Sequence, residues 1–178
     1  FVFFTKYVDE IELSIPSLSV VGLFFVCYAG WGLTVRILSR KIPDRWGRRK
    51  MLLFGAIVMA SGQFTYLLVD KGHAWFVIVP ALITGMGHAL MFHTSTSLFV
   101  QTFPERSRGV GSAFALMIVD TGMIGGAPAI GWIAGRFGYN TMFVTVGAAV
   151  ISAIVVYSVA SIPVWKERFR LSQADRSL

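Results

Sequence analysis

Long apolar runs alternate with short polar segments along almost the whole chain. The runs span residues 13–35, 51–69, 74–104, 109–135 and 137–165, and apart from histidine their only acid or base is Asp120. A helix needs about 20 apolar residues to cross a bilayer, and each run reaches or nearly reaches that length. The pattern predicts an all-α integral membrane protein with five full transmembrane helices.

The charges between the runs predict an orientation. Segments 36–50, 103–109 and 166–178 carry thirteen of the sixteen lysines and arginines, and they alternate with loops that carry only three. Positive residues collect on the cytoplasmic side of membrane proteins. These three segments, and with them the carboxyl terminus, are therefore expected to be cytoplasmic.

Composition narrows the function classes. The chain is 55% hydrophobic and 14% charged, with a net charge of +7. In a soluble chain that charge would suggest nucleic acid as a partner, but here it follows the membrane topology, so no nucleic-acid partner is expected. Cys27 is alone, and His88 and His93 are five residues apart, which places them on different faces of a helix. No metal site and no cofactor are predicted.

The first residues suggest an incomplete chain. Residues 1–4 resemble the last turn of an earlier apolar helix, and no signal peptide precedes the first run. The expected domains are a partial transmembrane helical bundle over 1–165 and a cytoplasmic basic tail over 166–178. An amino-terminal portion of the same protein is expected upstream.

Glycine and proline concentrate in the fourth run. Glycines four residues apart form a groove that lets another helix backbone come close, and proline bends a helix by removing a backbone hydrogen bond. Helix packing is the favoured interpretation, with direct substrate contact as the alternative. The residues concerned are Gly122, Gly126, Pro128, Gly131 and Gly135.

The loop between the first and second runs carries a specific motif. Residues 44–50 read Asp-Arg-Trp-Gly-Arg-Arg-Lys, which resembles the signature loop of the major facilitator superfamily. Segments 104–109 and 125–131 are similar to the loop before the eleventh helix and to the Gly-Pro-rich stretch of that family. The resemblance implies that the runs are helices eight to twelve of a twelve-helix alternating-access transporter, with the end of helix seven before them. Arg40 departs from the family, which usually has glycine there.

The same loop predicts a cytoplasmic gating network. Asp44 lies among many cations, arginine is suited to planar pairing with carboxylates, and Gly47 permits a tight turn. Glu105 is expected to pair with Arg45, and Arg108 with Asp44, so that the network latches one conformation. The alternative is a solvated, positively charged anchor. The candidate residues are Arg36, Asp44, Arg45, Gly47, Arg48, Arg49, Glu105 and Arg108.

The membrane interior holds candidate coupling residues. Asp120 lies near mid-depth, where a charge is costly unless it is paired or hydrated, and histidine exchanges protons readily near neutral pH. The resemblance implies that His88 and Asp120 line one central cavity, whereas Gln63 lies on a helix outside it. A structural hydrogen bond is the alternative role for Asp120. The expected proton-coupling or substrate-cavity residues are Asp120, His88, His93, Thr84, Tyr28 and Trp31.

These patterns predict a secondary active transporter of the bacterial inner membrane rather than an enzyme. No Gly-x-x-x-x-Gly-Lys loop for ATP occurs in the chain. The expected activity is proton-coupled efflux of a small organic solute, resembling the drug and sugar-efflux branch of the family. The expected partners are that solute, protons and the lipid bilayer. Proton-linked or passive metabolite uptake is the first alternative, and a membrane receptor, assembly subunit or enzyme is another.

Overall fold

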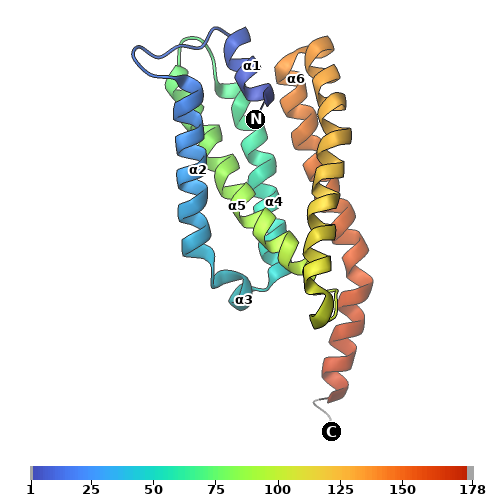
Figure 1. The fold of residues 1–178 in the computed structure, drawn as a ribbon. Helices are drawn as coiled ribbons and strands as arrows, with labels where there is room; N and C mark the ends of the chain where they lie inside the picture. The colour runs from blue at the N-terminus through green and yellow to red at the C-terminus, as the bar shows by residue number, and fades with distance from the viewer. Residues whose placement is uncertain (1, 176–178) are drawn as a thin grey trace.

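The computed structural model describes residues 2–175, and its long elements are helices that lie side by side (Figure 1). Short 3-10 turns connect several of them: η1 (Tyr66–Leu68), η2 (Ala74–Val77) and η3 (Glu105–Ser107). The helices are α1 (Val2–Glu10), α2 (Val20–Ser39), α3 (Ile42–Trp46), α4 (Arg48–Thr65), α5 (Ile78–Val100) and α6 (Arg108–Asp175).

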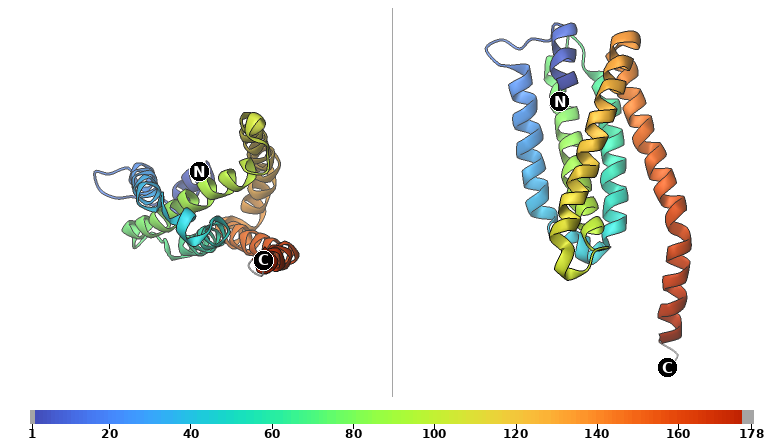
Figure 2. Two further views of the ribbon diagram at one scale, coloured as in Figure 1. Left: turned by 90° about the horizontal axis from the view of Figure 1, so that it is seen from below. Right: turned by 45° about the vertical axis from the view of Figure 1, so that its right-hand side comes forward.

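α6 consists of two helical arms that meet at Gly138. The backbone of Gly138 has φ 82° and ψ 164°, which is not helical and favours glycine. The arms, 108–137 and 139–175, fold back on one another (Figure 2). Within residues 2–175, four segments are long and apolar enough to cross a membrane, and the last is this folded pair. The prediction of an all-α bundle with five crossings is confirmed.

The segments predicted to be cytoplasmic gather at one end of the bundle. α3 and the turn η3 lie at the lower end of the bundle in Figure 1, and the far end of α6 extends beyond them in the same direction, away from the fold-back at Gly138. This arrangement agrees with the alternation of charge along the sequence.

Two predicted helix boundaries were wrong. The amino-terminal helix extends to Glu10 rather than ending at residue 4. α2 begins at Val20, not at residue 13, because Ser19 caps it: the amide of Gly22 donates a hydrogen bond of 3.1 Å to the Ser19 hydroxyl. α6 continues through residue 166 to Asp175, so no change of backbone structure separates the expected tail from the bundle. Residues 176–178 of that tail lie outside the described part of the chain.

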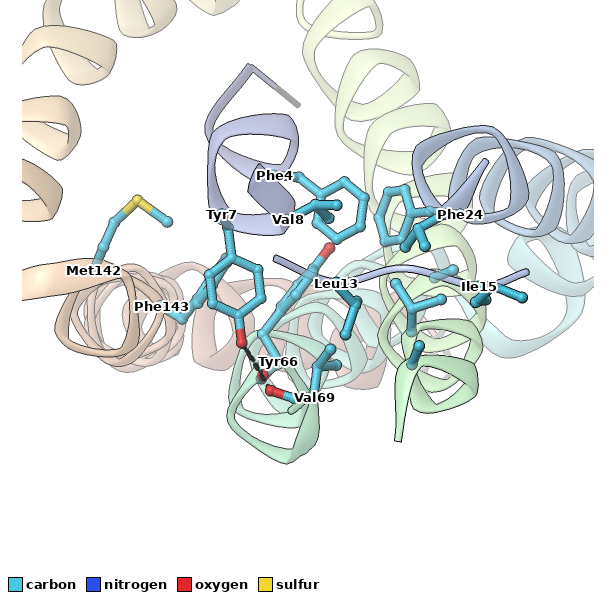
Figure 3. Packing of buried hydrophobic residues seen from close by; sticks show 14 of the residues in the cluster. Phe4, Tyr7, Val8, Leu13, Ile15, Phe24, Tyr66, Val69, Met142 and Phe143 are labelled. Carbon is cyan, nitrogen blue, oxygen red and sulfur yellow. Dashed lines mark hydrogen bonds between the residues drawn. The ribbon is translucent and has the colours of Figure 1, made fainter. Parts of the chain in front are cut away.

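A cluster of buried hydrophobic residues, with aromatic rings among them, forms a core near the end opposite α3 (Figure 3). The hydroxyl of Tyr7 donates to the backbone carbonyls of Tyr66 and Val69, at 3.2 and 3.0 Å. The rings of Tyr66 and Phe143 stack with centroids 4.3 Å apart. These contacts fix the short α1 against η1 and the second arm of α6.

Among the described residues, α5 packs closely on its neighbours at Gly85 and Gly87, whereas Gly122 and Gly126 of the predicted seam meet no described helix. A Cβ atom on Gly85 would lie 2.6 Å from the Tyr28 carbonyl oxygen, and one on Gly87 would lie 2.6 Å from the Met59 amide nitrogen. Gly85 thus brings α5 onto α2, and Gly87 brings it onto α4. A Cβ on Gly122 or on Gly126 would meet no described atom within 4 Å.

The other two glycines of the seam differ from each other. A Cβ on Gly135 would also meet no described atom within 4 Å, whereas one on Gly131 would lie 3.2 Å from the ring of Phe3. Pro128 lies within the first arm, which has helical backbone angles up to Gly138. Packing of the Gly122–Gly126 pair on another helix therefore stays a prediction.

Substitution of Gly87 by alanine is expected to destabilise the fold. The added methyl would overlap the backbone of Met59, so α4 and α5 would have to separate, at a cost of about 1–3 kcal/mol. The thermal unfolding midpoint of the full-length protein in detergent measures the effect, with Gly109→Ala as the matched control, since a Cβ on Gly109 would meet no described atom within 4 Å. An equal midpoint for the two variants would contradict this account of the packing.

Candidate functional site

A cavity of about 250 Å³ lies inside the bundle, and we call it the interior cavity. Side chains from α1, α2, α4, α5 and the two arms of α6 line it together with Tyr66 of η1. Its polar lining residues are Tyr28, Gln63, Tyr66, Thr84 and His88. The remaining lining residues are apolar: Phe3, Phe4, Met59, Ile130, Met142, Phe143 and Val146.

His88 is surrounded by aromatic rings. Its imidazole stacks on Phe92 with centroids 5.6 Å apart and meets the edge of Tyr28 at 6.0 Å. Thr84, one turn earlier on α5, is buried and donates its hydroxyl proton to the Pro80 carbonyl at 2.5 Å. The site therefore combines an imidazole with flat apolar surfaces, which suits a ligand with both polar and aromatic parts.

A second cavity of about 270 Å³ adjoins the first between α2 and α5. Tyr28 and His88 line both cavities, and Arg36 lines only the second one, nearer α3. The pair Tyr28–His88 thus stands where the two spaces meet. A side-chain movement of either residue would change the connection between them.

Gln63 lines the interior cavity, although the sequence predicted only a structural role for it. Only 8% of Gln63 is exposed, and it lies on α4 facing the interior cavity. The resemblance had placed its helix outside the cavity. The available signal was the amide itself, since a polar side chain within a membrane span marks a functional position by default.

Three predicted site residues lie elsewhere. Asp120 is exposed on the first arm of α6 and lines neither cavity that contains His88. Trp31 is 40% exposed on α2 and also lies outside both cavities. His93 is exposed and lines a separate space of about 100 Å³ beside α3. The structure therefore brings together Tyr28, Thr84 and His88 but not the other three.

Arg48 is the centre of the contacts around the signature loop. Its guanidinium lies 3.3 Å from the carboxylate of Asp44 and donates to the Ser97 hydroxyl at 2.5 Å. With its amide suitably oriented, Gln101 also accepts from Arg48. One half-buried arginine at the start of α4 therefore connects α3 to the carboxyl-terminal end of α5.

Arg49 makes the connection to α6. Its Nε donates to the hydroxyl of Tyr157 at 3.3 Å, and its guanidinium lies 5.7 Å from the centre of that ring. Gly47, which precedes this pair of arginines, has φ 91°, so the predicted tight turn between two helices is confirmed. The loop thus anchors α4 to three other helices.

The expected pairing across the loops was wrong. Glu105 pairs with Arg108 at 3.3 Å, one turn further along the chain, rather than with Arg45. Asp44 pairs with Arg48, not with Arg108. In each case a cation three or four residues further along the helical turn is within reach of the carboxylate. The carboxylate can therefore form its ion pair without contact between the two loops.

Two polar pairs lie at the opposite end of the bundle. Lys71 contacts Glu12 at 2.6 Å and lowers the pKa of that carboxyl, first through its hydrogen bond and then through its charge. His73 lies 3.1 Å from Asp70, and its hydrogen bond lowers the pKa of Asp70. All four side chains are exposed, so these pairs contribute little to stability.

Comparisons with known proteins give three informative relatives. The chain is 30% identical over 114 residues to Dipeptide and tripeptide permease B of Shigella dysenteriae serotype 1 (strain Sd197), covering 62% of the chain and 23% of the relative. It is 27% identical over 161 residues to Multidrug resistance protein 2 of Bacillus subtilis (strain 168), covering 86% and 38%. It is 32% identical over 120 residues to an uncharacterized MFS-type transporter of Mycobacterium tuberculosis (strain CDC 1551 / Oshkosh), covering 66% and 28%.

The chain thus matches between 23% and 38% of the length of these relatives. No solved structure matches it significantly. These relatives are named as a permease, a multidrug resistance protein and a transporter, in agreement with a membrane transport function rather than an enzymatic one. The family model described as Major Facilitator Superfamily matches residues 6–174, nearly the whole chain. This membrane-spanning bundle of helices belongs to the Major Facilitator Superfamily.

Proposed function

We propose that the chain is the carboxyl-terminal half of a secondary active transporter that exports a small organic solute in exchange for protons. The observation that carries the proposal is the interior cavity, where His88, Gln63 and Thr84 lie among aromatic rings. Transporters of this class bind substrate near the bilayer midplane, between halves that rock around it. The other half of the site would come from the amino-terminal portion of the same protein.

The lining favours a solute with an aromatic or apolar body. Tyr28, Tyr66, Phe4 and Phe143 offer ring faces, which attract flat rings and organic cations. The similarity to a protein named as a multidrug resistance protein supports efflux. The similarity to a protein named as a dipeptide and tripeptide permease favours proton-linked uptake as a second candidate. Ethidium is a suitable probe because it is a planar aromatic cation.

The coupling group in this proposal is Asp120. It lies near the middle of the first arm of α6, on a face that is exposed in the described chain. Nearby Met117, Met123 and Ile124 are 55%, 66% and 77% exposed. A carboxylate facing hydrocarbon would be costly, so this face is assigned to a hydrated pathway against the amino-terminal half. His88 would bind substrate or relay protons from inside the bundle.

The contacts of Arg48 and Arg49 form the proposed cytoplasmic latch. They hold α4 to α3, α5 and α6 in the conformation described, and release of Arg48 from Asp44 and Ser97 would free the end of α5. A buried or half-buried charge-assisted hydrogen bond is worth about 1.5–3 kcal/mol. That is enough to bias an equilibrium between two conformations about tenfold or more.

The proposed orientation is tested by labelling single cysteines. In the full-length protein with Cys27 replaced by serine, Ser39→Cys is expected to resist a membrane-impermeant thiol reagent added to intact cells, whereas Gly72→Cys reacts. The basis is the thirteen-to-three distribution of cations. Reaction of Ser39→Cys from outside, with Gly72→Cys protected, would reverse the orientation.

The role of the interior cavity is tested with two histidines of the same helix. His88→Gln is expected to raise the KM for ethidium about fivefold, because the substitution removes an aromatic ring, stacked on Phe92, from the lining of the cavity. His93→Gln, which changes the histidine beside α3, should leave KM unchanged. The measurement is ethidium transport by the full-length protein in vesicles. Equal KM values for the two variants would remove His88 from the binding site.

A further inference from the structure

An apolar groove of about 360 Å³ lies between α4, α5 and the second arm of α6, apart from the interior cavity. α4 contributes Leu52, Leu53 and Ala56, which follow Arg49 by three, four and seven residues. These spacings place all four residues on one face of the helix. Arg49 therefore stands at one end of an apolar stripe that extends about 10 Å along α4.

The second arm of α6 repeats this arrangement from the other side. Tyr157 lines the groove, and Val150, Ala153 and Ile154 precede it by seven, four and three residues. The hydroxyl of Tyr157 accepts the hydrogen bond from Arg49. The two helices thus form the walls of the groove. One end of the groove is polar, at the Arg49–Tyr157 pair, and the opposite end is apolar.

The two neighbouring arginines differ in how their charge is balanced. Arg48 has a carboxylate partner in Asp44 and further acceptors on α5. Arg49 is half-buried, and its contacts recorded among the described side chains are with the neutral Tyr157. No ion pair with Arg49 is found in that part of the chain. A half-buried guanidinium is complementary to a phosphate, which it binds through paired hydrogen bonds.

We propose that this groove binds an anionic phospholipid of the cytoplasmic leaflet, with its phosphate on Arg49 and one acyl chain between α4 and the second arm of α6. Lys50, exposed beside Arg49, adds a second cation at the same end. The small side chains of Ala56 and Ala153 leave the space that the acyl chain fills. Basic sites between membrane helices on this side bind lipid headgroups in this way. The bound lipid would hold α4 against α6 at the end where the latch operates.

The test measures lipid binding to the full-length protein by native mass spectrometry, with phosphatidylglycerol and phosphatidylcholine as probes. Arg49→Gln is expected to weaken phosphatidylglycerol binding about fivefold, the factor for one cation beside an anionic lipid surface, and to leave phosphatidylcholine binding unchanged. Arg40→Gln is the matched control, since it removes the same charge from the space beside His93. An unchanged affinity in Arg49→Gln, or an equal loss in Arg40→Gln, would overturn the proposal.

A second variant tests the acyl-chain position without changing charge. Ala153→Trp fills the groove from an exposed position on α6, so it should reduce binding of both lipids. Full retention of phosphatidylglycerol by Ala153→Trp would show that the chain lies elsewhere and would overturn the assignment. The inference rests on the proposed orientation of the bundle. Because lipid binding is measured without transport, the experiment can contradict the lipid site without contradicting the transport proposal, and the reverse also holds.

Discussion

Asp120→Asn is expected to abolish ethidium transport driven by a pH gradient in vesicles that contain the full-length protein. Asparagine has nearly the shape of aspartate and makes hydrogen bonds, but it cannot bind and release a proton. Asp120 is the only acid in the apolar runs of the chain, and it lies on an exposed face of α6. A carboxylate within a membrane span is costly and rare, which makes Asp120 the candidate coupling group of the chain.

Two further measurements separate proton coupling from a structural role. Asp120→Glu restores a titratable carboxyl and should recover part of the gradient-driven transport. Exchange of ethidium without a gradient should survive in Asp120→Asn, because exchange needs no net proton movement. Gradient-driven transport at the normal rate in Asp120→Asn would instead make Asp120 a structural residue.

Arg48→Gln is expected to lower the transport rate at least tenfold while the protein still inserts into the membrane. The substitution removes the ion pair with Asp44 and weakens the contacts with Ser97 and Gln101 at the end of α5. Loss of charge-assisted hydrogen bonds of about 1.5–3 kcal/mol would shift the balance between conformations by a factor of ten or more. The readout is the initial rate of ethidium transport per inserted protein.

The neighbouring Arg45 provides the control. Arg45 lies on α3 in the same loop, is exposed, and makes no ion pair within the described residues. Arg45→Gln removes an identical charge and should leave the rate nearly unchanged. Equal rates for the two variants would mean that the loop acts through its total charge, as a membrane anchor, and not through the contacts of Arg48.

The number of helices was predictable because hydrocarbon excludes charge over the whole length of a span. The same criterion misplaced the start of α2. Leu13 and Ile15 are apolar and precede α2. They are only 6% and 7% exposed because they pack into the hydrophobic core at the end of the bundle. Hydrophobicity along a sequence does not distinguish a loop buried in protein from a helix buried in lipid.

The rotation of each helix was less predictable than its length. Thr84 and His88 were expected together because they are four residues apart on one helix, and they do share the interior cavity. Whether Gln63 and His93 line the cavity depends on which face of α4 or α5 meets the neighbouring helices. Contacts such as that of Gly87 with Met59 set this rotation. Such contacts join residues distant in sequence, so no local spacing shows them.

The partners of the loop charges were also beyond the sequence. Asp44 and Glu105 were identified as interacting residues, but their partners were assigned across loops, as Arg108 and Arg45. The structure pairs them within one helical turn, where closing the contact costs less chain entropy. Spacings of three and four residues would have favoured those local pairs.

The most direct test of the account is whether protons move with the solute. The full-length protein is reconstituted in vesicles that enclose a pH-sensitive dye, and ethidium transport is started by adding ethidium on one side of the membrane with no pH gradient imposed. Exchange of protons for ethidium predicts that the internal pH changes as ethidium moves, because protons travel in the opposite direction. Vesicles with Asp120→Asn should show no pH change. Ethidium transport by the unmodified protein with no movement of protons would contradict proton-coupled export.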